Sequence, residues 1–270
     1  MPDHSALPSA LAANTRFMTL GGVPALVAHP DWTNSAPAML WMHGRTVNKE
    51  LDPGRYLRWM RAGIAAVALD LPGHGERANP PLHAAEHTLK VVSGMLGELD
   101  GVVASLSQPP LEGLFDVFRL GIGGMSAGGM VTLRRLCDPH PFVCAAVEAT
   151  CGDLTALYSH AGRSGPGPAP HADAAIAPLD PAQHLNGWRP IPLLALHTKA
   201  DQWVPFDAQE AFLAKLGEHY REAGADPRTI ELRSWETTGA PYEHAGFGAF
   251  GTEAKNIQTE FLIRHLRPAT

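Results

Sequence analysis

The feature that most constrains the fold is an alternation, kept along the whole chain, of short apolar runs and longer amphipathic stretches. Several apolar runs are continuous, which is typical of parallel strands buried on both faces. Strands are expected at residues 23–28, 38–42, 64–69, 118–123, 143–147, 191–196 and 229–235. Helices are expected at residues 51–62, 83–105, 127–137, 207–223 and 252–266. This order predicts an α/β fold with a mostly parallel, doubly wound sheet of about seven or eight strands and flanking helices.

Capping and breaking residues predict where some of these helices end. Asp207 and Thr252 are expected to be N-caps, and Gly224 is expected to end the helix before it. The stretch 83–105 holds three glycines that are expected to weaken or break it: Gly94, Gly97 and Gly101.

The chain shows no internal repeat and no interdomain linker, so a single domain over residues 1–270 is expected. An inserted lid is expected at about residues 154–190, because residues 159–190 are rich in Gly and Pro and too long for an ordinary connection. A plain surface loop is an equally good interpretation of this segment. Four of its side chains are candidates for the entrance of a site: His160, Arg163, His171 and Trp188.

Composition excludes several classes of protein. The net charge of −6 provides no basic surface for a nucleic acid or an anionic membrane, and no apolar stretch is long enough to span a bilayer. The N-terminus lacks a basic segment followed by an apolar core, so a cytoplasmic protein is expected. Three cysteines in no CxxC pair predict neither a disulfide framework nor a zinc site: Cys137, Cys144 and Cys151.

A possible nucleophile follows the predicted strand 118–123. The segment Gly124-Met125-Ser126-Ala127-Gly128 matches G-x-S-x-G and lies between a strand and a helix, the context in which a serine hydroxyl is raised on a sharp turn. The alternative is a glycine-rich anion-binding loop. That alternative is weaker because the lysine of a phosphate-binding loop is missing.

A nucleophilic serine needs a base and an acid, which follow it in the order acid, then histidine. Asp201 comes just after the predicted strand 191–196 and is the favoured acid. Asp207, Glu148 and Asp153 are the competing acids. His244 lies between the last strand and the last helix, whereas His219 and His265 lie in predicted helices. His244 is therefore the expected base.

Oxyanion donors are expected from the backbone N–H groups of Ala127 and Arg45. Arg45 lies in the loop after strand 38–42, where Gly44 lets the backbone approach a substrate. The Arg45 side chain has three interpretations: it meets an acidic substrate group, it is solvated, or it pairs with Glu50. His43 comes too early in the chain to be the base and is expected to be buried and to shape this loop.

Together these motifs resemble the α/β-hydrolase family, closest to its dienelactone-hydrolase and prolyl-oligopeptidase-like esterases. They are HGR at 43–45, DLPGHGER at 70–77, GMSAGG at 124–129 and D-x-x-V-P at 201–205, followed by His244. The resemblance implies that Ser126, Asp201 and His244 form a catalytic triad, with no metal and no organic cofactor. Asp70 and His74 are expected to brace the rim of the site.

The resemblance implies a serine hydrolase whose partner is a small-molecule carboxylic ester, without nucleic acid or membrane. Gly44, Met125 and Trp203 are expected to contact this substrate. A thioesterase or acyltransferase, a small peptidase, and a non-catalytic binding protein of the same fold are the alternatives. The sequence leaves a homo-oligomer open.

Overall fold

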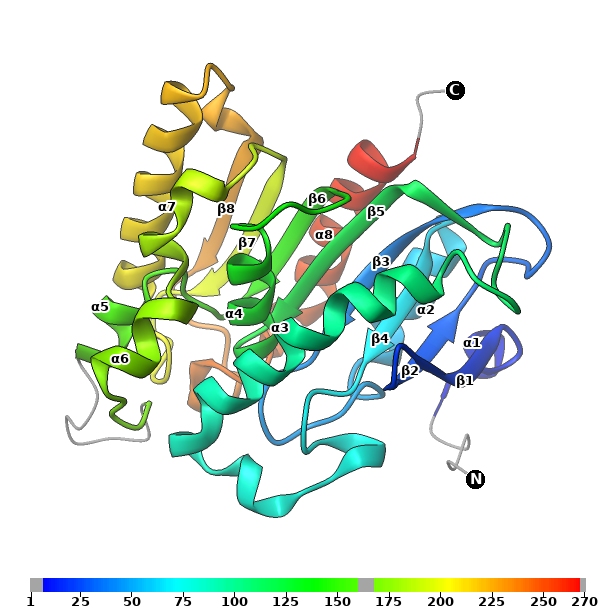
Figure 1. Ribbon diagram of the computed structural model, residues 1–270, viewed down its shortest axis with the longest axis horizontal. Helices are drawn as coiled ribbons and strands as arrows, with labels where there is room; N and C mark the ends of the chain where they lie inside the picture. Colours follow the sequence, from blue (N-terminus) through cyan, green and yellow to red (C-terminus); the bar gives the residue numbers. More distant parts are fainter. Residues whose placement is uncertain (1–6, 160–167, 268–270) are drawn as a thin grey trace.

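The computed structural model describes residues 7–159 and 168–267, and within them eight strands form one sheet (Figure 1). Its order is β1-β2-β4-β3-β5-β6-β7-β8. Strands β3 to β8 pair parallel, whereas β1 and β2 pair antiparallel and β2 joins β4 antiparallel. The bounds are β1 Thr15–Leu20, β2 Val23–Ala28, β3 Ala36–Met42, β4 Ala65–Leu69, β5 Phe115–Met125, β6 Phe142–Glu148, β7 Leu193–Thr198 and β8 Ile230–Trp235. The predicted doubly wound sheet is confirmed, and β1 is a strand that the prediction missed.

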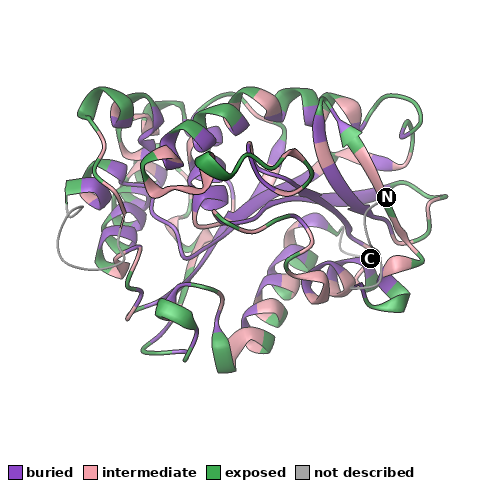
Figure 2. Cartoon of the chain, turned by 90° about the horizontal axis from the view of Figure 1, so that it is seen from below, coloured by how far each residue is buried: buried purple, intermediate pink, exposed green. Residues whose placement is uncertain are grey.

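Helices cover both faces of the sheet, so that the strands lie buried between two helical layers (Figure 2). Side chains of α1, α2 and α8 pack in one apolar layer, and those of α3, α4, α5 and α7 pack in the other. Successive residues of β3 supply opposite layers, as Leu40 and Trp41 do. The bounds are α1 Ser9–Ala12, α2 Pro53–Arg61, α3 Thr88–Ser105, α4 Ala127–Arg135, α5 Leu154–Ser159, α6 Asp173–Ile176, α7 Phe206–Glu222 and α8 Gly251–Leu266.

The glycines of α3 were expected to weaken or break this helix, and the helix runs unbroken from Thr88 to Ser105, so the predicted break is wrong. A Cβ on Gly94 would lie 3.1 Å from Pro72, and a Cβ on Gly21 would lie 2.3 Å from the carbonyl carbon of Gly101. Gly94 and Gly101 therefore lie close to the loops that hold Pro72 and Gly21, whereas Gly97 has open space around it. The helix also starts later than predicted, at Thr88, because short 3-10 turns occupy residues 80–87.

Two of the three predicted helix ends are wrong by a few positions. Helix α7 begins at Phe206 after Pro205, and α8 begins at Gly251, so Asp207 and Thr252 lie inside the first turn instead of capping it. A carboxylate in the first turn still favours the helix through its dipole. Gly224 follows the end of α7 with φ +72°, which confirms it as the residue that ends the helix.

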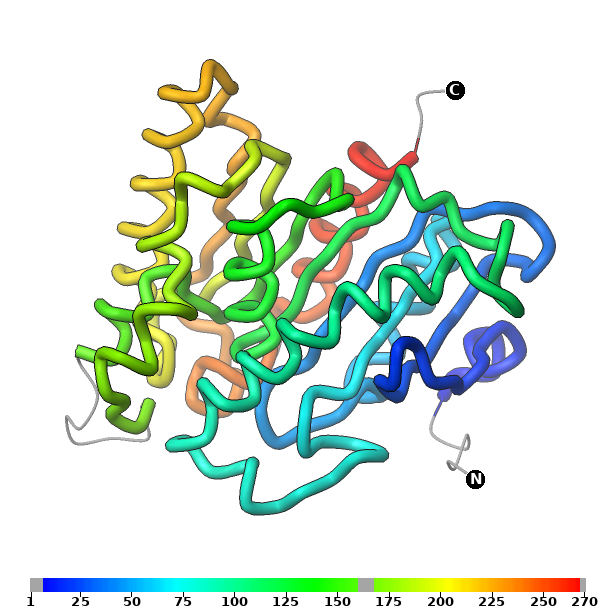
Figure 3. Tube along the Cα trace, viewed as in Figure 1, coloured from blue at the N-terminus to red at the C-terminus, as the bar shows by residue number. Residues whose placement is uncertain are grey.

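Strand β8 forms one outer edge of the sheet and the β1–β2 hairpin lies at the other, as the chain trace shows (Figure 3). Two charged residues of β8 pair with the last helix. The guanidinium of Arg233 lies 2.8 Å from Glu253, and Arg264 lies 2.7 Å from Glu231. These ion pairs attach the edge strand to α8.

The three cysteines are free and buried. Burial raises the pKa of each thiol to about 12, so they are packed as neutral side chains.

Among the described residues, no helix is long and apolar enough to cross a membrane.

Candidate active site

Polar side chains from distant parts of the chain meet at the carboxyl edge of the sheet. Ser126 follows β5, Asp201 follows β7 and His244 follows β8. Because β5, β7 and β8 are parallel, their ends lie on the same edge. The structure therefore brings together three residues that the sequence separates by up to 118 positions.

Ser126 sits on a strained turn between β5 and α4. Its φ is +52° and its ψ is −117°, a conformation that non-glycine residues rarely adopt. A Cβ on Gly124 would lie 2.5 Å from the backbone of Gly128, and a Cβ on Gly128 would lie 2.3 Å from the carbonyl oxygen of Met42. Only glycine fits at both positions, which explains the spacing of the G-x-S-x-G motif.

The turn is held from the neighbouring strand. The N–H of Ser126 donates to the carbonyl of Glu148 at 2.9 Å, and the hydroxyl of Thr150 donates to the carbonyl of Ser126 at 2.9 Å. Both backbone groups of the serine are thus hydrogen-bonded, which holds the strained turn in place.

The hydroxyl of Ser126 is hydrogen-bonded to His244. Its Oγ lies 3.0 Å from Nε2 of the ring, and Nδ1 of the same ring lies 2.8 Å from Oδ2 of Asp201. The other carboxylate oxygen of Asp201 accepts the N–H groups of Trp203 and Val204, both at 2.8 Å. Burial opposes ionisation of Asp201, but hydrogen bonds from His197 and His244 outweigh it and lower the pKa of the carboxyl. The ring and the carboxylate are both buried.

The competing acids and histidines have other partners. Glu148 binds Arg55, Asp153 pairs with Lys215 at 2.6 Å, and Asp207 lies in the first turn of α7. His219 contacts the carbonyl of Trp188 through Nε2, and His265 packs on Phe261. The structure brings none of these five groups into the Ser126–His244–Asp201 chain.

The loop after β3 lies against the serine. A Cβ on Gly44 would lie 3.4 Å from the Cβ of Ser126. The ring of His43 is buried, with Nδ1 at 2.6 Å from the carbonyl of Gly44 and Nε2 accepting the N–H of Leu71 at 3.1 Å. His43 therefore shapes this loop as expected. Burial lowers its pKa to about 4, so the ring is neutral and its proton is on Nδ1.

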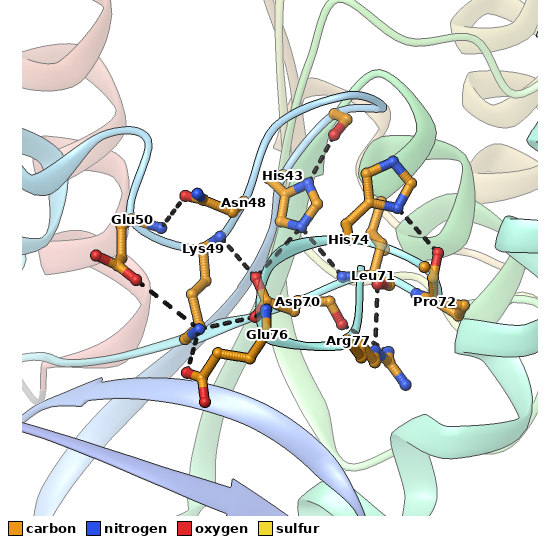
Figure 4. Close-up of polar contacts among 12 residues, drawn as sticks. His43, Asn48, Lys49, Glu50, Asp70, Leu71, Pro72, His74, Glu76 and Arg77 are labelled. Carbon is orange, nitrogen blue, oxygen red and sulfur yellow. Dashed lines mark hydrogen bonds and ion pairs between the residues drawn. The ribbon is translucent and has the colours of Figure 1, made fainter. Parts of the chain in front are cut away.

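A buried charge cluster anchors the far end of the same loop (Figure 4). The carboxylate of Asp70 accepts the backbone N–H of Lys49 at 3.0 Å and the amine of Lys49 at 2.7 Å. The same amine donates to Glu76 at 2.7 Å. Burial lowers the pKa of Lys49, but the hydrogen bonds to Asp70 and Glu76 reverse this effect and raise it. Asp70 thus braces the loop, whereas His74 bonds the carbonyl of Pro72 through Nδ1 at 2.9 Å.

The position of the Arg45 side chain excludes two of the three environments that the sequence allows. It donates to the carbonyl of His83 and is partly buried, so it is neither freely solvated nor paired with Glu50. Arg45 lines the site next to Gly44, and Ala127 begins α4, where first-turn N–H groups have no acceptor within the helix.

Two hollows flank Ser126. The larger has a volume of about 350 Å³ and is lined by Gly44, Met125 and Trp203 as well as by the charged pair Arg55 and Glu148. The smaller has a volume of about 40 Å³ and is lined by side chains that include Arg45, Thr88, Met130, Tyr158 and Trp203. Gly44, Met125 and Trp203 therefore all lie at the site.

The Arg55–Glu148 pair was not predicted. Its partners come from α2 and β6, 93 residues apart, and no motif in the sequence contains either of them. The sequence predicts Glu148 only as a competing acid for the triad. The single available signal was its position at the end of a buried strand.

The predicted lid is only partly described. His160 and Arg163 lie outside the described residues. His171 packs edge-on against Tyr158 beside the smaller hollow. Trp188 is buried and donates to the hydroxyl of Tyr220 at 3.1 Å, so it belongs to the core and not to the entrance.

Within residues 7–159 and 168–267, no cluster of His, Cys, Asp and Glu is arranged to hold a metal ion.

Comparison with known proteins gives matches in sequence and in fold. The prolyl oligopeptidase family matches residues 55–229. A curated protein of Bacillus subtilis (strain 168), "Putative esterase YitV", is 30% identical over 122 residues, which cover 44% of this chain and 47% of that protein. The chain thus matches about half the length of this relative.

Solved structures share the fold at low sequence identity. TT1662 from Thermus thermophilus has a TM-score of 0.69 and 22% identity, covering 94% of this chain and 98% of that one. A puromycin-hydrolyzing peptidase of Mycobacterium tuberculosis has a TM-score of 0.73 and 19% identity, covering 97% of this chain but 41% of that one. The esterase Pf2001 of Pyrococcus furiosus has a TM-score of 0.63 and 16% identity, covering 93% and 92% of the two chains.

Proposed function

The chain belongs to the prolyl oligopeptidase family of α/β-hydrolases, a serine-hydrolase family, and on that premise we propose that it hydrolyses small carboxylic esters through an acyl-enzyme on Ser126. The observation that carries this proposal is the hydrogen-bonded chain from Ser126 through His244 to Asp201. The esterase names of YitV and Pf2001 support an ester over other acyl substrates.

In the proposed mechanism, Nε2 of His244 takes the hydroxyl proton as Ser126 Oγ attacks the ester carbonyl carbon. Asp201 holds the ring through Nδ1–H and stabilises its protonated form. The N–H groups of Ala127 and Arg45 donate to the oxyanion. The C–O bond to the alcohol then breaks, and the alcohol leaves with the proton from His244. A water that His244 deprotonates attacks the acyl-enzyme and releases the acid.

The test is hydrolysis of p-nitrophenyl acetate by the wild type and by Ser126→Ala. We expect Ser126→Ala to lose about 10³-fold or more in kcat, because the nucleophile is gone. The control is Ser105→Ala, which removes an exposed hydroxyl that donates to the carbonyl of Gly101, and it should keep full activity. Retention of most activity by Ser126→Ala, or failure of a fluorophosphonate probe to label the wild type, would exclude the proposal.

A peptidase is the second candidate, since the family match and the Mycobacterium tuberculosis structure both carry that name. A peptide p-nitroanilide and an acyl-CoA compared with p-nitrophenyl acetate separate peptidase, thioesterase and esterase. The ester proposal requires the highest kcat/KM on the ester after correction for the uncatalysed rate of each substrate.

A further inference from the structure

Arg45 and Ser126 line the same two hollows, and the Arg45 guanidinium has no anionic partner in the part of the chain that the structure describes. Its guanidinium donates to the carbonyl of His83, and no carboxylate of residues 7–159 or 168–267 forms an ion pair with it. Arg45 is partly buried and lines the smaller hollow together with Ser126 and His244, and its charge acts on Tyr158 in the same wall. A partly buried guanidinium without a counter-ion is costly unless a ligand supplies the charge.

The other walls of this hollow also favour an anion. Thr88 begins α3 and Ala127 begins α4, so the positive ends of two helix dipoles face the space. Tyr158 lines it as well, and burial raises the pKa of its phenol while the nearby Arg45 opposes the rise, so the hydroxyl keeps its proton. The carboxylate that acts on Arg45 is Glu86, whose side chain is exposed, so solvent screens its charge.

The size of the hollow limits what it accepts. Its volume of about 40 Å³ is far below the roughly 350 Å³ of the larger hollow, so it suits one small polar group better than a long chain. The guanidinium offers a planar fork of donors that matches the two oxygens of a carboxylate. A long alkyl chain would instead have to enter the larger hollow of about 350 Å³.

We infer that the smaller hollow is a carboxylate-binding subsite, so that the preferred substrate is an ester that itself carries a free carboxylate, held by Arg45 with help from Tyr158. This inference rests on the proposed ester hydrolysis at Ser126. It assigns to the Arg45 side chain a role in specificity that is separate from the proposed role of its backbone N–H.

The test compares two esters of matched length: 4-nitrophenyl hydrogen glutarate, which is anionic, and its neutral methyl ester, 4-nitrophenyl methyl glutarate. We expect the wild type to favour the anionic ester by roughly ten- to a hundred-fold in kcat/KM, as a charge-assisted pair does. In Arg45→Gln this ratio should fall to about one. Because the backbone of Arg45 is also assigned to the oxyanion, the ratio is the readout and not the absolute rate.

Three variants and three outcomes complete the design. Arg45→Lys should keep part of the preference, Tyr158→Phe should lower it several-fold, and Arg61→Gln, which removes an exposed arginine of α2, should leave it unchanged. A wild type that hydrolyses both esters equally overturns the inference while ester hydrolysis stands. The same holds if Arg45→Gln keeps the full preference. If the wild type hydrolyses neither ester and no phosphonate labels it, the proposed function fails and the inference fails with it.

Discussion

Replacing Arg55 by methionine should destabilise the fold strongly, because it leaves a buried carboxylate without its cation. Arg55 donates to the two carboxylate oxygens of Glu148 at 2.5 and 2.8 Å and to Gln258 at 2.5 Å, and all three side chains are buried. Breaking a buried ion pair by removing one partner costs about 3–5 kcal/mol of the free energy of unfolding. Arg55→Met should lose this amount at pH 7.

A double-mutant cycle isolates the pair. Arg55→Met combined with Glu148→Gln removes both charges and keeps an amide that can bond Gln258, so it should lose only about 1–2 kcal/mol. Urea unfolding followed by circular dichroism gives each free energy. The control is Arg61→Met on the exposed side of the same helix, which should change stability by less than about 0.5 kcal/mol.

The loss of stability in Arg55→Met should also depend on pH. Burial raises the pKa of Glu148 in the folded protein, against the opposing effect of Arg55. Without Arg55 that pKa rises further. An acid whose pKa is higher in the folded protein than in the unfolded protein favours folding at pH values below its unfolded pKa. This contribution is lost as the pH rises through the pKa of the folded protein. The deficit of Arg55→Met should therefore be larger at pH 8 than at pH 5. Equal deficits at both pH values, or a double variant as unstable as the single one, would refute this reasoning.

Two further predictions concern the loops of the site. Gly75→Ala should cost about 3 kcal/mol or more, because its φ is +55° and a Cβ would lie 2.1 Å from the carboxylate of Asp70. Thermal melting measures both effects, with Gly63→Ala as the control. Gly63 also has a positive φ but has open space around it, so this variant should lose only about 1 kcal/mol of stability. Asp201→Asn should lower kcat about 10³- to 10⁴-fold with little change in KM, because the amide no longer holds the proton of His244 on Nδ1. A loss under tenfold in steady-state kinetics would contradict the role proposed for Asp201.

The central strands could be predicted because they are buried on both faces and therefore read as continuous apolar runs. Val23–Ala28 and Ala65–Leu69 are examples, since nearly every residue in them is buried. Thr15–Leu20 was missed because it lies at an edge of the sheet, where five of its six side chains are not buried and the apolar run is interrupted. Burial on one side weakens the signal on which such a prediction depends.

The main residues of the site followed from a rule of position: in parallel sheets, polar residues just after strands meet at one edge. That rule predicts Ser126, Asp201 and His244 as neighbours from their positions in the sequence. It says nothing about side chains that meet through tertiary packing. The contacts of Arg45 with His83 and of Arg55 with Glu148 join loops and helices whose relative placement no local pattern encodes.

The charged outer strand β8 also affects how the protein behaves at high concentration. An unpaired strand edge is a template on which another chain can add, and this is a common start of fibrous aggregation. Here Glu231 and Arg233 are each bound to α8, and an incoming strand would have to approach past these charges. Neutralising both residues would leave the exposed Leu232 in an uncharged edge and should make the purified protein precipitate more readily.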